Sequence, residues 1–322
     1  MTLLRCEQTE RGVVALFENG ARNEADLLIG ADGIRSTVRR QYAPQIVPRY
    51  AGYVAWRGIV EESHIPSQRR ATTLQDMVFC LPDGELAFSI PITDSDGAGH
   101  RRCMFVWFRP ANFDTTLRDW CTDATGFCHG DSIPPPLIRK EVVADLHLAA
   151  RRLLAPQLAE LVAGARQPIL SAIFDLETTR MAFGRAALVG DAAFVARPHV
   201  GTSVTKAAQD AWSLADELAK EGDVGTALAL YERRRKPAGS ELVARGRRLG
   251  EHLEPGGAGL RPPIDTLLGE YGPGGAGARA IFSISLSCLR AAFTGCRACI
   301  SWWGSGAIGR HRCGSCFSCW GC

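Results

Sequence analysis

The sequence lacks a long hydrophobic run. Its longest apolar stretch without a charged residue is 280–289, whereas a membrane-spanning helix needs about 18 such residues. Near the N-terminus, Arg5 and Glu7 stand where an export signal would carry its apolar segment. We therefore expect a cytoplasmic protein with no membrane partner.

The sequence also lacks an excess of charge of either sign. Lys and Arg number 37 against 34 for Asp and Glu, which gives a net charge of +3 over 322 residues. Electrostatic binding to nucleic acid needs a much stronger positive field, so no nucleic-acid partner is expected. The hydrophobic share of 46% is near the globular average and predicts a folded body.

Acidic residues and lysine are missing from residues 280–322, which hold seven of the twelve cysteines. Residues 253–279, just before them, are rich in Gly and Pro, a composition typical of a flexible linker. A natural surface mixes charges of both signs. We therefore expect a disordered or non-native tail at 280–322.

The tail has a second interpretation. Cys296-x2-Cys299 and Cys313-x2-Cys316 have the spacing of a four-thiolate zinc site. A zinc-binding tail on a non-catalytic protein thus stays open as an alternative, although the missing acidic residues favour a tail without metal.

Residues 27–40, LLIGADGIRSTVRR, form the first motif. An apolar strand is expected to end in small residues around Asp32 and Gly33, and a helix begins near Arg35 or Ser36. Backbone can approach a ligand closely there, and a helix N-terminus favours a phosphate. An ordinary strand–turn–helix corner capped by Asp32 explains the pattern about equally well.

Residues 187–218 form the second motif. A strand is expected to end at Gly190-Asp191, and a loop with Pro198 and Gly201 leads to a helix over 202–220. The first turn of that helix would stabilise negative charge on a ring. Asp191 is placed to accept hydrogen bonds from sugar hydroxyls. The alternative is a plain strand–loop–helix unit.

Three further expectations concern the same region. Val204 and Ala207 are predicted on the apolar face of the 202–220 helix, with Lys206 and Asp210 elsewhere. Pro237 predicts a break or kink in the next helix, over about 225–249. His199 is a candidate proton relay, although a loop histidine is more often only solvated or capping.

The two motifs together resemble those of the FAD-dependent aromatic hydroxylases, class A flavoprotein monooxygenases with a p-hydroxybenzoate hydroxylase-like fold. YAGYVAWRGIV at 50–60 is similar to the strand that opens the substrate domain in the salicylate and 2,6-dihydroxypyridine hydroxylase branch. The resemblance implies an α/β protein with a Rossmann-type FAD domain and an inserted β-sheet substrate domain. The β-rich runs between 50 and 110 independently predict one antiparallel sheet.

The resemblance implies a function as well. With FAD, NAD(P)H as co-substrate and O2, such enzymes hydroxylate a phenolic or hydroxypyridine-type ring through a flavin C4a-hydroperoxide. Epoxidation or flavin oxidation on the same fold is the alternative within enzymes. No catalytic residue and no oligomeric state follow from the sequence.

The implied cofactor contacts fall in both motifs. Asp32, Gly33 and Arg35 would lie near the FAD pyrophosphate. In the second motif, Gly190 and Asp191 would approach the ribityl or ribose hydroxyls, Pro198 the reactive edge of the flavin, and the backbone of Gly201, Thr202 and Ser203 its pyrimidine ring.

The sequence departs from the family pattern in one important respect, because no G-x-G-x-x-G turn precedes the first motif. We therefore expect an FAD-domain remnant without its first βαβ unit, N-terminally truncated and weakly active or inactive. The expected division is FAD-domain portions at 1–49 and 181–252, a substrate domain at 50–180, the linker at 253–279 and the tail at 280–322.

Overall fold

The computed structural model describes residues 2–74, 77–93, 101–254 and 298–301. Its strands are β1 Leu3–Gln8, β2 Val13–Phe17, β3 Arg22–Ala25, β4 Leu27–Gly30, β5 Arg49–Glu61, β6 Val78–Cys80, β7 Leu86–Thr93, β8 Arg101–Pro110, β9 Ile169–Glu177, β10 Ala182–Phe183, β11 Ala186–Leu188, β12 Phe194–Val195 and β13 Ala298–Ser301. Its α-helices are α1 Thr37–Tyr42, α2 Ser67–Thr73, α3 Arg118–Trp120, α4 Lys140–Leu153, α5 Pro156–Gly164, α6 Ser203–Lys220 and α7 Val224–Gly250. No helix in these ranges is long and apolar enough to cross a membrane.

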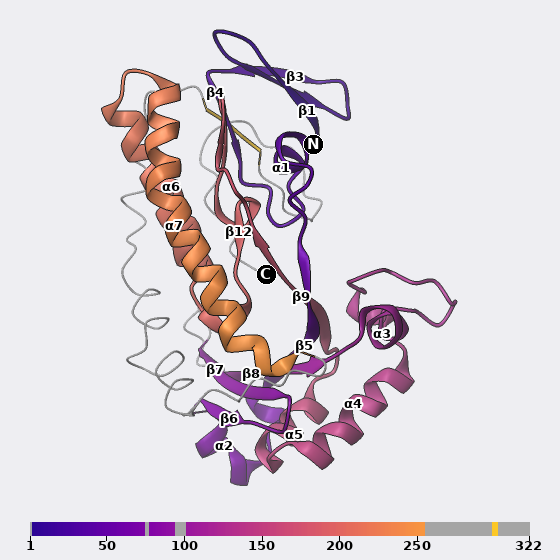
Figure 1. The fold of residues 1–322 in the computed structure, drawn as a ribbon. Helices are drawn as coiled ribbons and strands as arrows, with labels where there is room; N and C mark the ends of the chain where they lie inside the picture. The colour runs from indigo at the N-terminus through magenta and orange to yellow at the C-terminus, as the bar shows by residue number, and fades with distance from the viewer. Residues whose placement is uncertain (1, 75–76, 94–100, 255–297, 302–322) are drawn as a thin grey trace.

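A six-stranded antiparallel sheet occupies one end of the molecule, in the order β12-β9-β5-β8-β7-β6 (Figure 1). Strand β5 is central and pairs with β8 on one side and β9 on the other. Its side chains alternate between faces, so that Val54 and Trp56 lie in one core cluster and Tyr53 and Ala55 in another. The predicted antiparallel sheet between 50 and 110 is confirmed, and β9 and β12 extend it.

Helices α4 and α5 lie beside this sheet (Figure 1). Val142, Leu146 and Ala150 recur at helical spacing on α4 and are buried in the same cluster as Trp56. Leu158 and the other buried residues of α5 join this cluster. The opposite face of the sheet carries Tyr53, which contacts His199 of the second motif.

The second structural unit is built on parallel strands. Strand β4 pairs in parallel with β11 on one side and β13 on the other, and β10 extends the sheet beyond β11. The long helices α6 and α7 run side by side along it (Figure 1). Leu27, Leu28, Ile29 and Leu188 are buried in its core, as expected for strands covered on both faces. The predicted α/β fold with an inserted β-sheet is confirmed.

The structure corrects two expectations about the helices. On α6, Val204 is 61% exposed, whereas Lys206 and Asp210 are almost fully buried, so the predicted apolar face is wrong there. The two buried side chains pair with each other and with backbone, which removes the usual cost of burying charge. Helix α7 continues through Pro237, so the predicted break is wrong, while the alternative of a kink stays a prediction.

The C-terminal predictions fall mostly outside the described ranges. The linker at 253–279 is described only at its first two residues, and Cys296, Cys313 and Cys316 are not described. Within the tail, β13 pairs with β4. The division into domains and the tail's character thus stay predictions, as does the missing βαβ unit.

Candidate functional site

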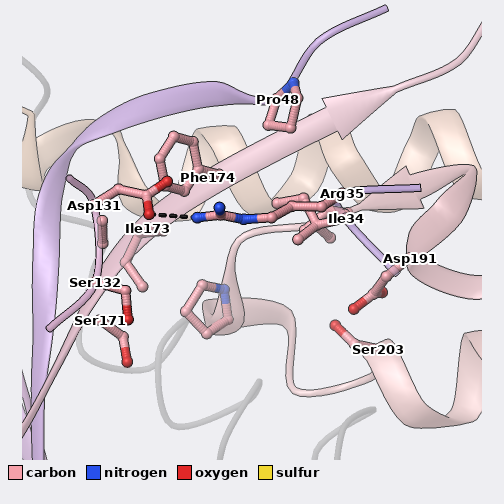
Figure 2. A pocket seen from close by; sticks show the side chains of 14 residues that line it. Ile34, Arg35, Pro48, Asp131, Ser132, Ser171, Ile173, Phe174, Asp191 and Ser203 are labelled. Atoms are coloured by element: carbon pink, nitrogen blue, oxygen red, sulfur yellow. Dashed lines mark hydrogen bonds and ion pairs between the residues drawn. The ribbon is translucent and has the colours of Figure 1, made fainter. Parts of the chain in front are cut away.

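A pocket of about 360 Å³ lies where the parallel-stranded unit meets strand β9 of the large sheet. This volume is in the usual range for small-molecule sites. Figure 2 shows the pocket. Its lining residues come from both motifs, from the residue before β5, from the loop after α3 and from β9: Ile34, Arg35, Pro48, Asp131, Ser132, Ser171, Ala172, Ile173, Phe174, Asp191, Val195, Ala196, Pro198 and Ser203.

The first motif turns sharply into α1. Gly33 has a φ of +72°, a conformation that glycine adopts without strain. One Asp32 carboxylate oxygen accepts hydrogen bonds from the amides of Thr37 (2.7 Å) and Val38 (3.3 Å). Its other oxygen, Oδ1, is buried without a hydrogen-bond partner in the described part of the chain. Asp32 thus caps the first amides of α1, as one of the two interpretations of the sequence pattern predicted, and its Oδ1 has no partner among the described residues.

Arg35 extends across the pocket. Its guanidinium forms an ion pair with Asp131, which lies in the loop after α3 (Figure 2). The Arg35 side chain is 69% exposed, so this contact is a weak one that an anionic ligand can replace. The pair places the positive charge of the first motif at the pocket.

A buried arginine, which sequence reasoning missed, ties the two motifs together. Arg39 is 1% exposed and donates hydrogen bonds to the carbonyls of Ala192 (2.9 Å), Ile46 (3.3 Å) and Ile34. Burial lowers its pKa. Because Ala192 follows Asp191, this side chain fixes the distance between the motifs.

The Gly190 turn is held by a buried charge pair on α6. The Gly190 amide donates to Asp210 Oδ2 (3.1 Å), and Lys206 Nζ donates to the Gly190 carbonyl (2.9 Å) and to Asp210 Oδ2 (2.8 Å). Arg235 of α7 donates to the other Asp210 oxygen at 2.8 Å. The four-residue spacing of Lys206 and Asp210, which suits an ion pair on one helix face, is the signal that sequence reasoning overlooked.

Replacing Gly190 with alanine should destabilise the fold. Its φ is +59°, and an added Cβ would lie 3.2 Å from Cβ of Ala207. A left-handed conformation costs an alanine about 1–2 kcal/mol, so urea unfolding should show a loss of that size. Gly222→Ala is the matched control, since nothing lies within 4 Å and its φ is not positive. Equal stability of the two variants would contradict this role for Gly190.

Asp191 and Ser203 lie near one another on one side of the pocket (Figure 2). Asp191 is an exposed residue of the pocket lining, and nearby protein atoms partly desolvate its carboxylate. This desolvation raises its pKa, Lys206 opposes the rise, and Asp210 adds to it. A carboxylate in such a setting gains from neutral hydroxyl donors, which supply hydrogen bonds without a full counter-charge.

The N-terminus of α6 opens beside Asp191. Thr202, the cap residue, forms no capping hydrogen bond, and its Oγ1 is buried without a hydrogen-bond partner in the described ranges. Gly201 has a φ of +61° and ends the short turn that begins at Pro198. Because the Thr202 side chain does not cap this turn, the helix dipole and the amides at the start of α6 form a site for a partly negative ring edge.

His199 lies outside the pocket lining. It is 1% exposed, shares a 2.7 Å hydrogen bond with the Tyr53 hydroxyl, and packs against Phe108 with ring centroids 4.6 Å apart. Burial, with His252 and Arg197 nearby, lowers its pKa to about 3. This position suits a core histidine and does not bring it to the pocket as a proton relay.

The buried His199 predicts a pH-dependent stability. Its ordinary pKa is about 6.5, so between about 6.5 and 3 the unfolded chain binds a proton that the folded chain does not. Stability should therefore fall as the pH falls through this window, by at most about 1.4 kcal/mol per pH unit from this group. Urea unfolding from pH 7 to 4.5 should show a flatter profile for His199→Asn. Identical slopes would contradict the assignment.

The structure brings four of the predicted cofactor residues to the pocket: Arg35, Asp191, Pro198 and Ser203. The other five do not line the pocket but belong to the turns and helix starts next to its lining residues: Asp32, Gly33, Gly190, Gly201 and Thr202. Sequence reasoning missed the wall that Ser171, Ile173 and Phe174 of β9 provide. Nothing in the motif spacing pointed to that strand.

Two family models match the chain. One, described as FAD binding domain-like, matches residues 50–175, and one described as FAD binding domain matches residues 143–246. Together these ranges include nearly all of the large sheet and the whole of the second motif.

Two curated relatives are a monooxygenase and a hydroxylase. The chain is 29% identical over 261 residues to 2,6-dihydroxypyridine 3-monooxygenase of Paenarthrobacter nicotinovorans, covering 80% of this chain and 64% of that protein. It is 30% identical over 292 residues to salicylate hydroxylase of Pseudomonas putida, covering 82% and 60%. The chain thus spans less than two thirds of the length of these relatives.

Solved structures show the same fold. The structure of 2,6-dihydroxypyridine-3-hydroxylase from Arthrobacter nicotinovorans matches with a TM-score of 0.75 and 28% identity, over 81% of this chain and 66% of that chain. Klebsiella pneumoniae HpxO, solved as a complex with FAD and uric acid, matches with a TM-score of 0.57 and 26% identity, over 77% and 56%. In its motifs, its relatives and its fold, the chain is similar to the FAD-dependent aromatic hydroxylases.

Proposed function

We propose that the pocket between the two motifs holds the flavin of FAD, and that the protein hydroxylates a small phenolic or hydroxypyridine-type ring with NAD(P)H and O2. The observation that carries this proposal is the convergence of Arg35, Asp191, Pro198 and Ser203 on one pocket. Bound FAD would supply the redox and oxygen chemistry, and the protein the binding and orientation.

The residues present fit the flavin half of FAD. Asp191 would accept hydrogen bonds from the ribityl hydroxyls, and Arg35 would exchange Asp131 for a phosphate. The first turn of α6 would stabilise negative charge on the pyrimidine ring, and the buried Thr202 Oγ1 lacks a hydrogen-bond partner among the described residues. Ile173 and Phe174 supply an apolar wall that excludes water from the ring.

The sequence offers no comparable site for the ADP half of FAD. No G-x-G-x-x-G turn precedes the first motif in this sequence, and such a turn is the usual backbone cradle for the pyrophosphate. We expect these 322 residues alone to bind FAD weakly and to oxidise NAD(P)H slowly.

The function is tested by the fate of molecular oxygen. The protein, reconstituted with FAD and NADH or NADPH under 18O2, should convert a phenol or hydroxypyridine from a small panel into a product heavier by one 18O atom. Hydrogen peroxide with unchanged substrate would indicate an oxidase instead. Incorporation into an alkene, with no aromatic product, would indicate an epoxidase.

A further inference from the structure

A second pocket, which the proposed flavin site does not use, lies farther along strand β9, since residues 171–174 line the first pocket and residues 175–179 the second. It has a volume of about 370 Å³ and is lined by Gln45, Ile46, Val47, Arg49, Asp175, Leu176, Glu177, Thr178, Thr179, Lys236, Ser240 and Arg247. Pro48 lines the flavin pocket, while Val47 and Arg49 on either side of it line the second pocket. The two pockets are therefore neighbours with different walls.

The acidic side chains of the second pocket are already matched. Asp175 is fully buried and accepts from Arg197 (3.0 Å) and from Arg247 (2.7 and 3.0 Å). Glu177 accepts from a further Arg247 nitrogen at 3.0 Å. Both carboxylates thus have cationic partners, and they leave no strong negative field in the pocket.

Two cations of the second pocket have no such partner. Neither Arg49 nor Lys236 has a hydrogen bond or ion pair to any residue in the described part of the chain. Arg49 stands opposite Asp175 in the β5–β9 pairing, and Lys236 and Ser240 are four residues apart on α7, so they share one helix face. The half-buried Ser240 hydroxyl is also unpartnered among the described residues.

From this arrangement we infer that the second pocket binds a phosphate group, held by Arg49, Lys236 and the Ser240 hydroxyl. A phosphate carries a charge of about −1.5 to −2 at neutral pH, which matches two unpaired cations better than a carboxylate does. Arginine and lysine form the strongest hydrogen bonds with such an oxyanion. The site goes beyond the proposed flavin function and does not depend on it.

The test is calorimetric titration of the protein with inorganic phosphate at low ionic strength. One site is expected, and its dissociation constant should rise about tenfold or more in Lys236→Met and in Arg49→Gln. Lys220→Met is the matched control, because Lys220 is exposed on α6 and pairs with Asp216 away from the pocket. Thermal melting shows that the variants fold.

Competition with NADP+ and NAD+ distinguishes which kind of phosphate compound the site binds. If NADP+ alone displaces inorganic phosphate, the site binds a phosphate monoester. If NADP+ and NAD+ displace it equally, the site binds a nucleotide diphosphate. If neither displaces it, the site binds free phosphate. No saturable binding of inorganic phosphate, or binding that Lys236→Met and Arg49→Gln leave unchanged, would overturn the inference.

Discussion

Asp175→Asn should destabilise the protein by about 3–5 kcal/mol, the largest effect that we expect from any single substitution. The Asp175 carboxylate is fully buried and joins Arg197, which is 2% exposed, to Arg247 of α7. Without its charge, Arg197 would keep one ionic partner among the described residues, Glu254 at 2.7 Å. A buried cation that loses a counter-charge is far more costly than a broken surface pair.

The measurement is urea unfolding of wild type and Asp175→Asn at neutral pH. Asp216→Asn is the control: Asp216 also pairs with two cations, Lys220 and Arg234, but these pairs lie on the surface. Solvent screens such pairs, so this variant should unfold close to wild type. A loss below about 1 kcal/mol in Asp175→Asn would show that the network linking β9 to α7 is not a main source of stability.

Asp191→Ala should weaken flavin binding by about 1.5–3 kcal/mol for each hydrogen bond lost, which is about ten- to a hundredfold per bond. Asp191 lines the pocket, and its raised pKa reflects a crowded carboxylate that hydroxyl donors would relieve. The effect is measured by quenching of flavin fluorescence.

Two further variants make this result specific. Asp191→Asn keeps one acceptor oxygen and should bind with intermediate affinity. Asp114→Ala, an exposed residue outside the pocket lining, should bind flavin as wild type does. Equal affinity of wild type and Asp191→Ala would remove Asp191 from the site.

The sequence predicted the two strand–turn–helix corners because each is a local pattern. Apolar runs that end at Gly30 and at Gly190 define the two strands. Gly33, just after the first run, and Gly190, at the end of the second, adopt a positive φ where the chain turns. The antiparallel sheet after Arg49 follows from the same kind of signal, whereas the helix cap at Ser36 was missed, because the pattern assigned the capping role to Asp32.

Contacts between distant segments were not predictable in this way. The pairing of Arg39 with the Ala192 carbonyl spans 153 residues, and the Arg35–Asp131 pair spans 96. The apolar face of α6 was wrong because periodicity counts Lys206 and Asp210 as polar, although a buried pair with backbone partners belongs inside. Pro237 lies within α7 because packing along both sides of that helix outweighs one lost hydrogen bond.

The central claim is that the described pocket holds the flavin ring and its ribityl chain. The most direct test is a fluorescence titration of the protein with riboflavin and with FAD. The contacts that we assign reach the ring and the ribityl hydroxyls, which both ligands carry. The fluorescence of both should therefore be quenched, with dissociation constants within about tenfold of each other. No quenching by either ligand at millimolar protein, or strong binding of FAD with none of riboflavin, would contradict the claim.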